Sequence, residues 1–357
     1  MMRPSNFRML LRYPLLIVAF LLILFLAFLG WIQYDRTIHK EEHILFRGAT
    51  LPILPDTLSL ITWNIGYAGL GEEMDFFYDG GKMVRPPEAA ADSNFRAIQQ
   101  FISRDAAAHI YLFQEADAGS RRSWHQPQAR LLESVKTGYH AYFALNYDVA
   151  FVPMPLRSPM GRVRSGLLSL TDYQAAEAIR YTLPGRDSWP TRLFLPERCM
   201  LVMRYPLAGG GMLVVANIHN SAYDEQGIQR AEQMSWISRL LEEEYARGHY
   251  VIAGGDFNQS PEAYDPLMTS NGDMALSSMP ALTDSLLPGW IRAFDPITPS
   301  NRYVDEPYLR GRTRTTLIDY FLLSPNIRLL EVRTHDLGFR WSDHQPVEVK
   351  VMLGDRP

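Results

Sequence analysis

The chain has little cysteine and little lysine, and it lacks the glycine-rich loops of nucleotide-binding proteins. Cys199 is the only cysteine among 357 residues, which excludes an intramolecular disulfide and argues against a cysteine-ligated metal site. Lysine occurs four times, so arginine supplies nearly all of the positive charge. The net charge of −4 is small and requires no polyanionic partner. Neither GxGxxG nor GxxxxGK[ST] occurs, which disfavours a doubly wound nucleotide-binding sheet.

A long uncharged run, PLLIVAFLLILFLAFLGWI, stands near the N-terminus from Pro14 to Ile32. Its eighteen apolar residues from Leu15 onward are just enough to cross about 30 Å of hydrocarbon. We predict a single-pass transmembrane helix over residues 13–33, because basic residues precede the run and interfacial aromatics end it: Arg3, Arg8 and Arg12, then Trp31 and Tyr34. The positive-inside rule then places residues 1–12 in the cytoplasm and the remaining chain on the extracytoplasmic side. A cleaved signal peptide is the alternative, although no small residues mark a cleavage site.

The rest of the chain is interpreted as a linker over residues 34–55 and one catalytic domain over residues 56–357. No Gly/Ser-rich joint or internal repeat divides the second segment. Helical spacing of apolar residues appears around Phe95–Ile102 and Met234–Leu241. Strand-like runs recur between and around these helices, which predicts a layered α/β domain with mixed sheets. The predicted strands are Leu58–Asn64, His109–Gln114, Ala141–Asn146, Cys199–Arg204, Met212–Ile218, Tyr250–Gly254, Leu317–Leu323, Ile327–Thr334 and Val347–Met352.

Polar residues recur at or beside the ends of these apolar runs. Buried ionised groups are costly unless they are paired or bound to a metal, and strand ends at one rim of a sheet converge in space. Each residue alone fits a turn or cap, but the whole set predicts a site: Asn64, Gln114, Glu115, Asn217, His219, Asn220, Asp256, Asn258, Asp319, Asp343 and His344. Carboxylate and amide oxygens without thiolates favour Mg²⁺ or Mn²⁺ over zinc. A hard cation with a carboxylate and histidines fits hydrolysis of a phosphate ester.

Six motifs occur in a fixed order: TWN, FQE, NIH, GGDFN, IDYFLLS and SDHQPV. This series resembles the endonuclease/exonuclease/phosphatase superfamily over the whole region from Leu58 to Val351. That superfamily includes pancreatic-type deoxyribonucleases, abasic-site endonucleases, neutral sphingomyelinases and inositol-polyphosphate phosphatases. The resemblance implies an α/β fold, a four-layer α/β sandwich in which two packed mixed β-sheets are flanked by helices, with the site at one end.

The resemblance also implies a metal site. Glu115 is the expected principal ligand of Mg²⁺ (or Mn²⁺), with Asn64 beside it and Asp343 near the metal. Gly66 stands where some members carry a further carboxylate, which leaves the complete ligand set open.

The resemblance assigns the catalytic step to five residues. Asp256 would orient or deprotonate the attacking water, and Asn258 would hold a phosphate oxygen. Alternation along an extended chain would aim these two side chains the same way. Asp319 would pair with His344 and fix its tautomer and charge. His219 matches the histidine of the deoxyribonuclease and sphingomyelinase branches, which contacts the phosphate or assists the leaving group.

Three loops are open to two interpretations each. Residues 74–86 form either a substrate loop or an insertion packed by Phe76 and Phe77. Residues 147–170, rich in proline and arginine, form either a wall of the cleft or a rim loop. Residues 120–125 read as a helix start, although Arg121 or Arg122 would also suit a phosphate.

The favoured function is a metal-dependent phosphoesterase that acts on a phosphodiester or phosphomonoester, with a membrane lipid as the first choice of substrate. A nuclease acting on DNA or RNA is the second choice, because no cluster of basic residues marks a nucleic-acid surface. A non-catalytic binding module on the same fold is the hypothesis from another class. It is disfavoured because a scaffold has no need of the complete set of acids, amides and histidines.

Overall fold

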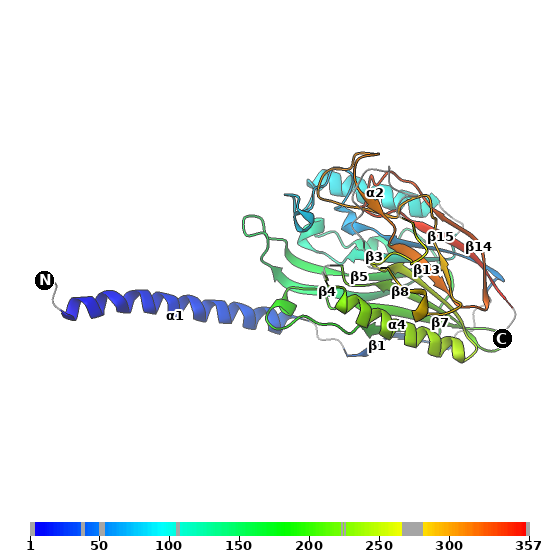
Figure 1. The fold of residues 1–357 in the computed structure, drawn as a ribbon, viewed down its shortest axis with the longest axis horizontal. Helices are drawn as coiled ribbons and strands as arrows, with labels where there is room; N and C mark the ends of the chain where they lie inside the picture. Colours follow the sequence, from blue (N-terminus) through cyan, green and yellow to red (C-terminus); the bar gives the residue numbers. More distant parts are fainter. Residues whose placement is uncertain are drawn as a thin grey trace.

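The computed structural model describes residues 4–36, 40–49, 54–104, 108–222, 224, 226–265 and 281–354, with only the backbone described for residues 4–12. Two mixed β-sheets pack face to face, and one long helix projects from an end of the domain (Figure 1). The first sheet has the order β1 (Glu42–Arg47), β6 (Glu177–Thr182), β7 (Cys199–Pro206), β8 (Met212–His219), β9 (Tyr250–Asp256), β13 (Asp319–Leu323), β10 (Ile291–Ala293). The second has the order β14 (Ile327–Thr334), β15 (Val347–Leu353), β2 (Thr57–Asn64), β3 (Ile110–Asp117), β5 (Gly161–Thr171), β4 (His140–Val152).

Each sheet contains one parallel pair, and these pairs fix where the site lies. β2 is parallel to β3, and β8 is parallel to β9, whereas the other pairings are antiparallel. A short ribbon of β11 (Asn301–Arg302) and β12 (Thr315–Thr316) stands beside the sheets. The carboxyl ends of all four parallel strands therefore meet at one end of the sandwich, where functional residues of α/β folds collect.

Helices cover the outer faces of both sheets, which completes the predicted four layers. Alternate residues of the central strands face either the inter-sheet core or a helix, so these strands read as continuous apolar runs. On β8, Val215 packs between the sheets, while Val214 packs with Met234 of α4 (Ile228–Ala246). α2 (Glu88–Arg104) and α3 (Gln128–Glu133) pack on the other sheet through a cluster that includes Phe95 and Leu132. The predicted four-layer α/β sandwich is confirmed.

Gly254 and Gly255 allow β9 to lie between its two neighbours. A Cβ on Gly255 would lie 2.0 Å from the carbonyl oxygen of Ile218 on β8, and its φ is +154°. A Cβ on Gly254 would lie 2.4 Å from the ring of Phe321 on β13. The two glycines in GGDFN therefore permit the close strand approach that brings Asp256 to the rim.

A buried polar contact ties the two sheets together. Gln114 on β3 donates its amide to Asn217 Oδ1 on β8 at 2.7 Å. Asn217 in turn donates to the carbonyls of Phe113 and Leu168. Both side chains are fully buried, so these strand-end amides hold the sheets in register and do not face the site.

The segment predicted as a linker, residues 34–55, contains a strand and a helix end. Residues 37–39 and 50–53 lie outside the described residues, but Glu42–Arg47 form β1, which pairs with β6 at the edge of the first sheet. Helix α1 (Pro4–Asp35) packs directly on the domain, since Leu29 and Ile32 are buried in a cluster with Val149 and Leu193. The linker prediction was therefore wrong for residues 42–47. The side chains of β1 are mostly exposed, so this edge strand has the polar sequence that is also typical of a linker.

Two of the uncertain loops are resolved by their packing. Residues 147–170 are mostly strand, since β4 extends to Val152 and β5 begins at Gly161, so only the tip of this hairpin is a loop. In residues 74–86, Met74, Phe76 and Val84 are buried, which supports the packed insertion. Residues 121–123 form a short 3₁₀ turn and do not begin an α-helix.

Candidate active site

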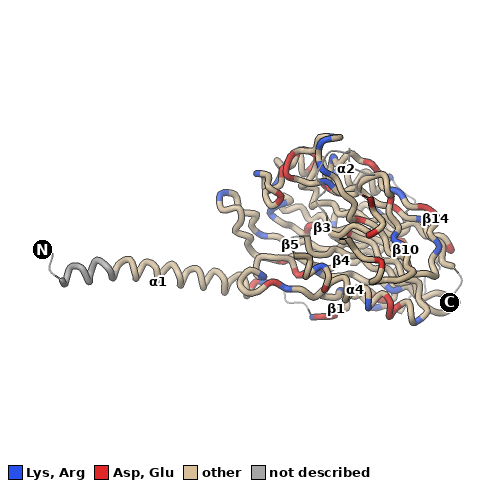
Figure 2. Tube along the Cα trace, viewed as in Figure 1, with Lys and Arg blue, Asp and Glu red and all other residues tan. Residues whose placement is uncertain are grey.

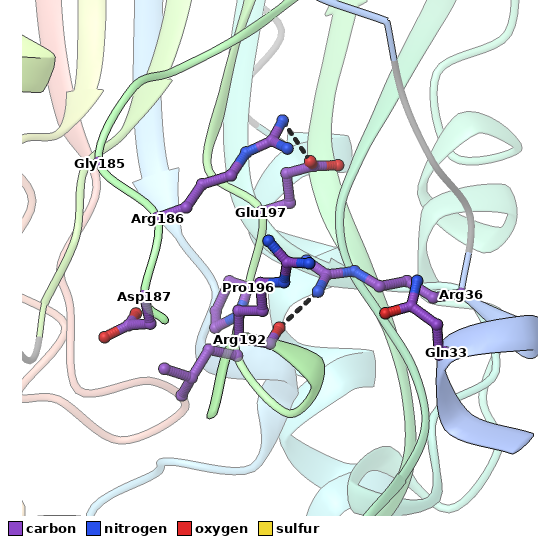
Figure 3. Close-up of a pocket in the computed structure, with 9 residues that line it drawn as sticks. Gln33, Arg36, Gly185, Arg186, Asp187, Arg192, Pro196 and Glu197 are labelled. Atoms are coloured by element: carbon purple, nitrogen blue, oxygen red, sulfur yellow. Dashed lines mark hydrogen bonds and ion pairs between the residues drawn. The ribbon is translucent and has the colours of Figure 1, made fainter. Parts of the chain in front are cut away.

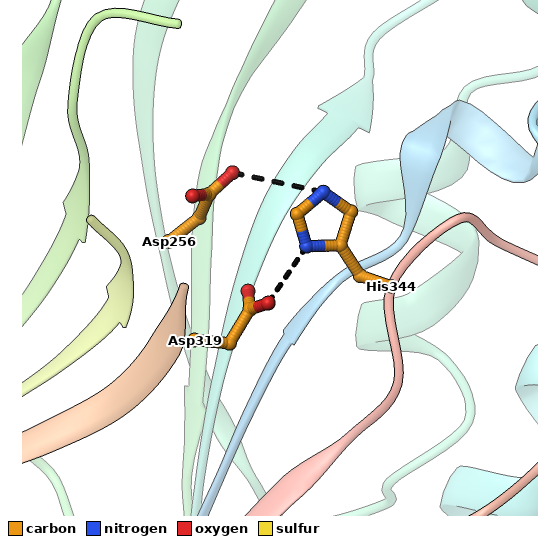
Figure 4. A group of neighbouring side chains, drawn as sticks. All are labelled: Asp256, Asp319 and His344. Atoms are coloured by element: carbon orange, nitrogen blue, oxygen red, sulfur yellow. Dashed lines mark hydrogen bonds and ion pairs between the residues drawn. The ribbon is translucent and has the colours of Figure 1, made fainter. Parts of the chain in front are cut away.

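Three side chains from neighbouring strands of the first sheet meet at one level. His219 at the end of β8 pairs in register with Asp256 at the end of β9, and Asp256 pairs with Asp319 at the start of β13. His344 comes from the loop before β15 and reaches the same group, with Nδ1 2.8 Å from Asp319 Oδ2 (Figure 4). Nearly all of their surface is buried. The predicted Asp319–His344 pair is therefore present in the structure.

Asp256 lies at the junction of the two sheets. Asn64, at the end of β2 in the other sheet, donates its Nδ2 to Asp256 Oδ2 at 3.0 Å. His219 Nε2 is 3.5 Å and His344 Nε2 is 3.8 Å from the same oxygen. Burial raises the pKa of Asp256 to about 6, with Asp319 adding to the shift and His344 opposing it. This carboxylate is thus basic enough to accept a proton near neutral pH.

The two histidines of the site have opposite charge states. Burial alone would lower the pKa of His344, but Asp319, Asp343 and Asp256 outweigh it and raise that pKa to about 10. Burial lowers the pKa of His219 well below its usual value, and Arg198 and His344 lower it further. At neutral pH the structure therefore contains an imidazolium at His344 and a neutral imidazole at His219, which suits them to different roles.

Glu115 is aimed by an irregular backbone. It lies in a β-bulge, where the pairing of β3 with β5 shifts between Phe113 and Ala116, and its φ of 55° is unusual for glutamate. Bulges and left-handed residues re-aim side chains next to active sites. The carboxylate keeps an exposed part and forms an ion pair with Arg122, whose Nη2 is 3.3 Å from Oε2.

Glu115 and Asp343 suit a hard cation. Burial raises the pKa of Asp343 to about 7, and repulsion from Glu115 adds to this shift while His344 opposes it. Two carboxylates that repel each other supply the oxygen donors that Mg²⁺ or Mn²⁺ prefers, and Asn64, whose Oδ1 accepts from the Gly66 N–H at 3.0 Å, would add an amide oxygen. The predicted ligands therefore fit a divalent cation.

Asp256, Asp319 and His344 fit a cation less well. Their ligand atoms lie within 4.8 Å of one another. However, Nδ1 of His344 is engaged by Asp319, and the raised pKa of His344 keeps this ring protonated, whereas a metal-bound histidine must be neutral. This group is better described as a hydrogen-bonded acid–histidine pair beside a carboxylate.

Asn258 is placed by a turn and not by strand alternation, so that predicted reason was wrong. β9 ends at Asp256, and Asn258 has a left-handed φ of 50°. Its backbone N–H donates to Asp256 Oδ1 at 2.9 Å, and its side-chain Nδ2 donates to the carbonyl of Asn220 at 3.0 Å. Asn258 thus orients Asp256 directly, and its role toward phosphate stays a prediction.

Two arginines, Arg122 and Arg198, lie beside these residues. Arg122 was one of two candidates in the sequence, whereas Arg198 belongs to none of the motifs. Arg122 is buried, pairs with Asp117 at 3.0 Å and with Glu115, and lies 3.9 Å over the ring of Tyr67. It therefore supports the Glu115 carboxylate, while a contact of Arg121 or Arg122 with phosphate stays a prediction.

Arg198 precedes β7, and the pairing of Met200 with Ile218 places it beside the end of β8 that carries His219. Its guanidinium makes no hydrogen bond or ion pair with any residue that the structure describes, yet Glu115 and Asp256 are near enough to oppose the lowering of its pKa by burial. An unpaired guanidinium at this rim is suited to a phosphate oxygen. A single arginine before a strand carries no sequence signal for such a role.

Residues 61–344 match a family model described as Endonuclease/Exonuclease/phosphatase family. No curated protein matches the chain. The chain is similar to an endonuclease/exonuclease/phosphatase from Beutenbergia cavernae DSM 12333, with a TM-score of 0.59 and 18% identity over 84% of this chain and 72% of that one.

Two further solved structures share the fold. An endonuclease/exonuclease/phosphatase from Bacteroides vulgatus gives a TM-score of 0.52 at 14% identity, over 83% of this chain and 99% of that one. ANGEL2, a 2',3'-cyclic phosphatase in complex with adenosine-2',3'-vanadate, gives 0.51 at 16% identity, over 89% and 99%. At these identities the similarity establishes the fold and leaves the substrate open.

Proposed function

Because this chain belongs to the Endonuclease/Exonuclease/phosphatase family, we propose that it is a divalent-metal-dependent hydrolase of phosphoesters in membrane lipid headgroups. Members of the family are phosphoester hydrolases that generally depend on a divalent metal. The observation that carries the proposal is the buried group of Asp256, His344 and Asp319 beside the Glu115–Asp343 carboxylates.

Glu115, Asn64 and Asp343 would hold the cation, which when bound would neutralise phosphoryl oxygens and stabilise the charge of the transition state. Asp256 accepts the proton of the attacking water, because its pKa of about 6 leaves it ionised and still basic at neutral pH. The hydrogen bonds from Asn64 and from the backbone of Asn258 fix the orientation of this carboxylate.

The histidines act on the phosphoryl group. His344, held by Asp319 and positively charged, stabilises negative charge that develops on a phosphoryl oxygen. His219, which is neutral and has an Nδ1 without a hydrogen-bond partner among the described residues, is available to contact the phosphate or the leaving group.

The membrane part of the proposal rests on α1. Residues Tyr13–Asp35 form a helix long and apolar enough to cross a membrane, and it carries no charge until its last residue (Figure 2). The turns from Phe28 onward pack on the domain, since Phe28 stacks on Phe194 with ring centroids 6.2 Å apart. Within the apolar span, fifteen residues, Tyr13–Ala27, precede this contact, roughly 22 Å of helix at 1.5 Å per residue. This is shorter than the ~30 Å hydrocarbon core, so a membrane-spanning α1 would bring the domain edge around Phe28 to the lipid interface.

That edge exposes apolar side chains. The tip of the β4–β5 hairpin projects from the same end of the domain as α1 in Figure 1, and it carries Leu156, 81% exposed, and Met154. Trp189 is also half exposed, in the segment that contacts α1. In the aromatic loop of Phe76 to Tyr78, Phe76 is buried while Tyr78 is exposed. Exposed apolar residues grouped around a membrane helix are typical of membrane contact.

A chain of contacts joins the active site to this edge of the domain. Glu115 pairs with Arg122, Arg122 lies over Tyr67, and Tyr67 belongs to the cluster that buries Leu29 and Ile32 of α1. A lipid phosphate at the interface is thus near the site, where tethering raises its effective concentration. We therefore favour a lipid headgroup ester over a soluble phosphoester.

The test compares substrates with Mg²⁺ present, using the full chain in phospholipid vesicles. Turnover of vesicle phospholipids should exceed turnover of DNA, RNA and soluble nucleotide or sugar phosphates by about tenfold or more, which corresponds to about 1.4 kcal/mol in transition-state stabilisation. Met154→Ala/Leu156→Ala should lower only the vesicle reaction, because these side chains lie outside the site.

Leu330→Ala is the matched control, since Leu330 is an exposed apolar residue on β14. It should leave both reactions unchanged. Efficient cleavage of DNA without turnover of any lipid would replace the lipid substrate with a nucleic acid.

A further inference from the structure

A polar pocket of about 140 Å³ lies where α1 meets the domain, separate from the active site. Gln33 and Arg36 come from the end of α1, and Arg186, Arg192 and Glu197 come from the segment between β6 and β7 (Figure 3). At about 30 Å³ per water molecule, this volume holds several waters and so accommodates a tetrahedral oxyanion.

The pocket has more positive charge than its own carboxylates neutralise. Glu197 is already engaged, by Arg186 at 2.6 Å and by Arg180 at 3.7 Å. Asp187 also lines the pocket, but Figure 3 shows its carboxylate directed away from the arginines. The pocket therefore keeps two guanidinium groups, those of Arg36 and Arg192, without a carboxylate of their own among the described residues.

Figure 3 shows the side chains of Arg36 and Arg192 close together, with Arg36 half-buried and Arg192 exposed to solvent. Arg36 Nη1 donates to the carbonyl of Arg192 at 2.5 Å, whereas the side chain of Arg192 has no hydrogen-bond or ion-pair partner in the described part of the chain. Burial lowers the pKa of Arg36, and the nearby Arg186 and Arg192 lower it further, although Glu197 opposes them. Guanidinium groups that repel each other across a hollow are stabilised by an anion between them.

The place of the pocket along α1 decides which anion is present. Arg36 directly follows the apolar span that ends at Asp35, and the exposed Trp31 and Tyr34 occupy the same end of the helix. Aromatic residues of this kind mark the headgroup level of a bilayer. In a chain anchored by α1, the pocket is therefore at the depth of the lipid phosphates.

We infer that this pocket binds the phosphate group of an anionic phospholipid, with Arg36 and Arg192 as its principal contacts. The inference rests on the proposed anchoring by α1, but it does not require that the bound lipid be hydrolysed. A lipid with net negative charge is favoured, because a zwitterionic headgroup carries its own cation and satisfies the arginines less well.

The pocket and the active site are adjacent but distinct. Glu197 lines the pocket, whereas the next residue, Arg198, lies near Glu115 and Asp256. Adjacent side chains thus serve two different phosphates, one retained in the pocket and one presented to the catalytic group.

The test uses hydrogen–deuterium exchange of the full chain in nanodiscs, which reports binding without any phosphoester hydrolysis. Backbone amides of Arg192, Leu193 and Phe194 are hydrogen-bonded within the pocket segment, so their exchange is slow enough to follow. In nanodiscs that contain phosphatidylglycerol, these amides should exchange about tenfold more slowly than in phosphatidylcholine alone, as expected at ten times the Kd.

Arg192→Gln should abolish the difference between the two lipids, and Arg192→Lys should retain most of it, because the charge is kept. Arg328→Gln is the matched control: it removes an exposed arginine from β14 at the opposite end of the domain, near the C-terminus. It should leave the effect of phosphatidylglycerol intact.

Three results would overturn the inference. The first is equal exchange in the two lipids, and the second is an effect of phosphatidylglycerol that survives Arg192→Gln. The third is full protection by inorganic phosphate in phosphatidylcholine nanodiscs, which would assign the pocket to a soluble anion. A chain that does not enter nanodiscs refutes the anchoring as well, whereas the other outcomes leave the proposed hydrolysis untouched.

Discussion

At the scale of residues, the surroundings of Asp256 and His344 give these two neighbouring side chains very different pKa values. Asp256 and His344 are both buried, and Nε2 of His344 lies 3.8 Å from Oδ2 of Asp256. The pKa of Asp256 is nevertheless about 6, whereas that of His344 is about 10. Burial raises the pKa of the Asp256 carboxyl and is only partly offset by His344, whereas burial lowers the pKa of His344 and is outweighed by three carboxylates, Asp319, Asp343 and Asp256. This arrangement keeps a base and a cation together at neutral pH.

Replacing Asp256 with Asn should therefore stop the chemistry without unfolding the chain. The amide keeps the shape of the side chain but cannot accept the proton, so turnover should fall by at least about a hundredfold. Thermal unfolding should move little, and Asp172→Asn, an exposed carboxylate at the far end of β5, should change neither property. A variant that unfolds early and keeps its specific activity would make Asp256 structural.

The pH profile of the wild-type chain provides the second readout for the same residues. Activity should rise with pH as Asp256 loses its proton, at or below pH 6 because a bound cation favours the ionised form. It should decline near pH 10 as His344 loses its proton. A profile without an acidic limb would contradict the role of Asp256 as base.

The sequence motifs located these residues because the acids, amides and histidines stand at strand ends. The turn at Asn258 was beyond prediction, since asparagine with a left-handed φ looks like any other asparagine in sequence. Arg198 was missed for a related reason: its neighbourhood with Glu115 and Asp256 is created by tertiary packing.

At the scale of elements, buried polar contacts hold the strands in register. Glu348 on β15 is buried and accepts from Arg333 Nη2 at 2.6 Å and from Ser59 on β2 at 3.1 Å. Burial alone would raise the pKa of Glu348, but hydrogen bonds from His335 and Arg333 outweigh it and lower that pKa to about 2.

Glu348→Gln should therefore destabilise the chain in a pH-dependent way. A carboxylate whose pKa is lower in the folded state contributes stability above its unfolded pKa of 4.5, and this is lost as pH falls toward 2. The variant should lose about 1.5–3 kcal/mol in the free energy of unfolding at neutral pH, the range for hydrogen bonds to charged groups. The difference from wild type should shrink between pH 4.5 and 2.

Denaturant unfolding at several pH values measures this difference. Glu331→Gln on β14 is the control, because Glu331 is half exposed and its ion pair with Lys350 lies at the surface, so its loss should cost at most about 1 kcal/mol. A constant difference at all pH values for Glu348→Gln would show that packing, and not the charge, is responsible.

Elements with two apolar faces were predictable, and edge elements were not. The central strands, such as Met212–His219, are buried on both faces and appear as unbroken apolar runs. β5 was taken for a loop because the proline-rich hairpin tip and the arginines Arg162 and Arg164 hide its alternation. β1 pairs only on one side and has few buried residues.

At the scale of the whole molecule, the domain and its apolar helix form one packed unit. Arg162 of β5 forms an ion pair with Asp35 of α1 at 2.7 Å, next to the buried Leu29 and Ile32. The segment predicted as a linker, residues 34–55, therefore begins within a helix end that packs on the domain. The sequence identified the helix by its composition, but the partner of its last turns lies far along the chain.

The proposed topology predicts an exported C-terminus. Arginines precede the apolar span, so the catalytic domain should lie outside the cytoplasmic membrane. A reporter that functions only after export, fused to the C-terminus, should give signal, while a reporter that works only in the cytoplasm should stay silent. The reverse pattern would refute this orientation.

The central claim is that Glu115 holds a divalent cation on which phosphoester hydrolysis depends. The most direct measurement is hydrolysis of an artificial phosphodiester by the full chain in detergent, with Mg²⁺, with Mn²⁺ and with excess chelator. Activity should require either cation and vanish in chelator. Glu115→Gln should lose at least about a hundredfold at saturating metal while its thermal unfolding stays close to wild type. Full activity in chelator, or an unaffected Glu115→Gln variant, would contradict the account.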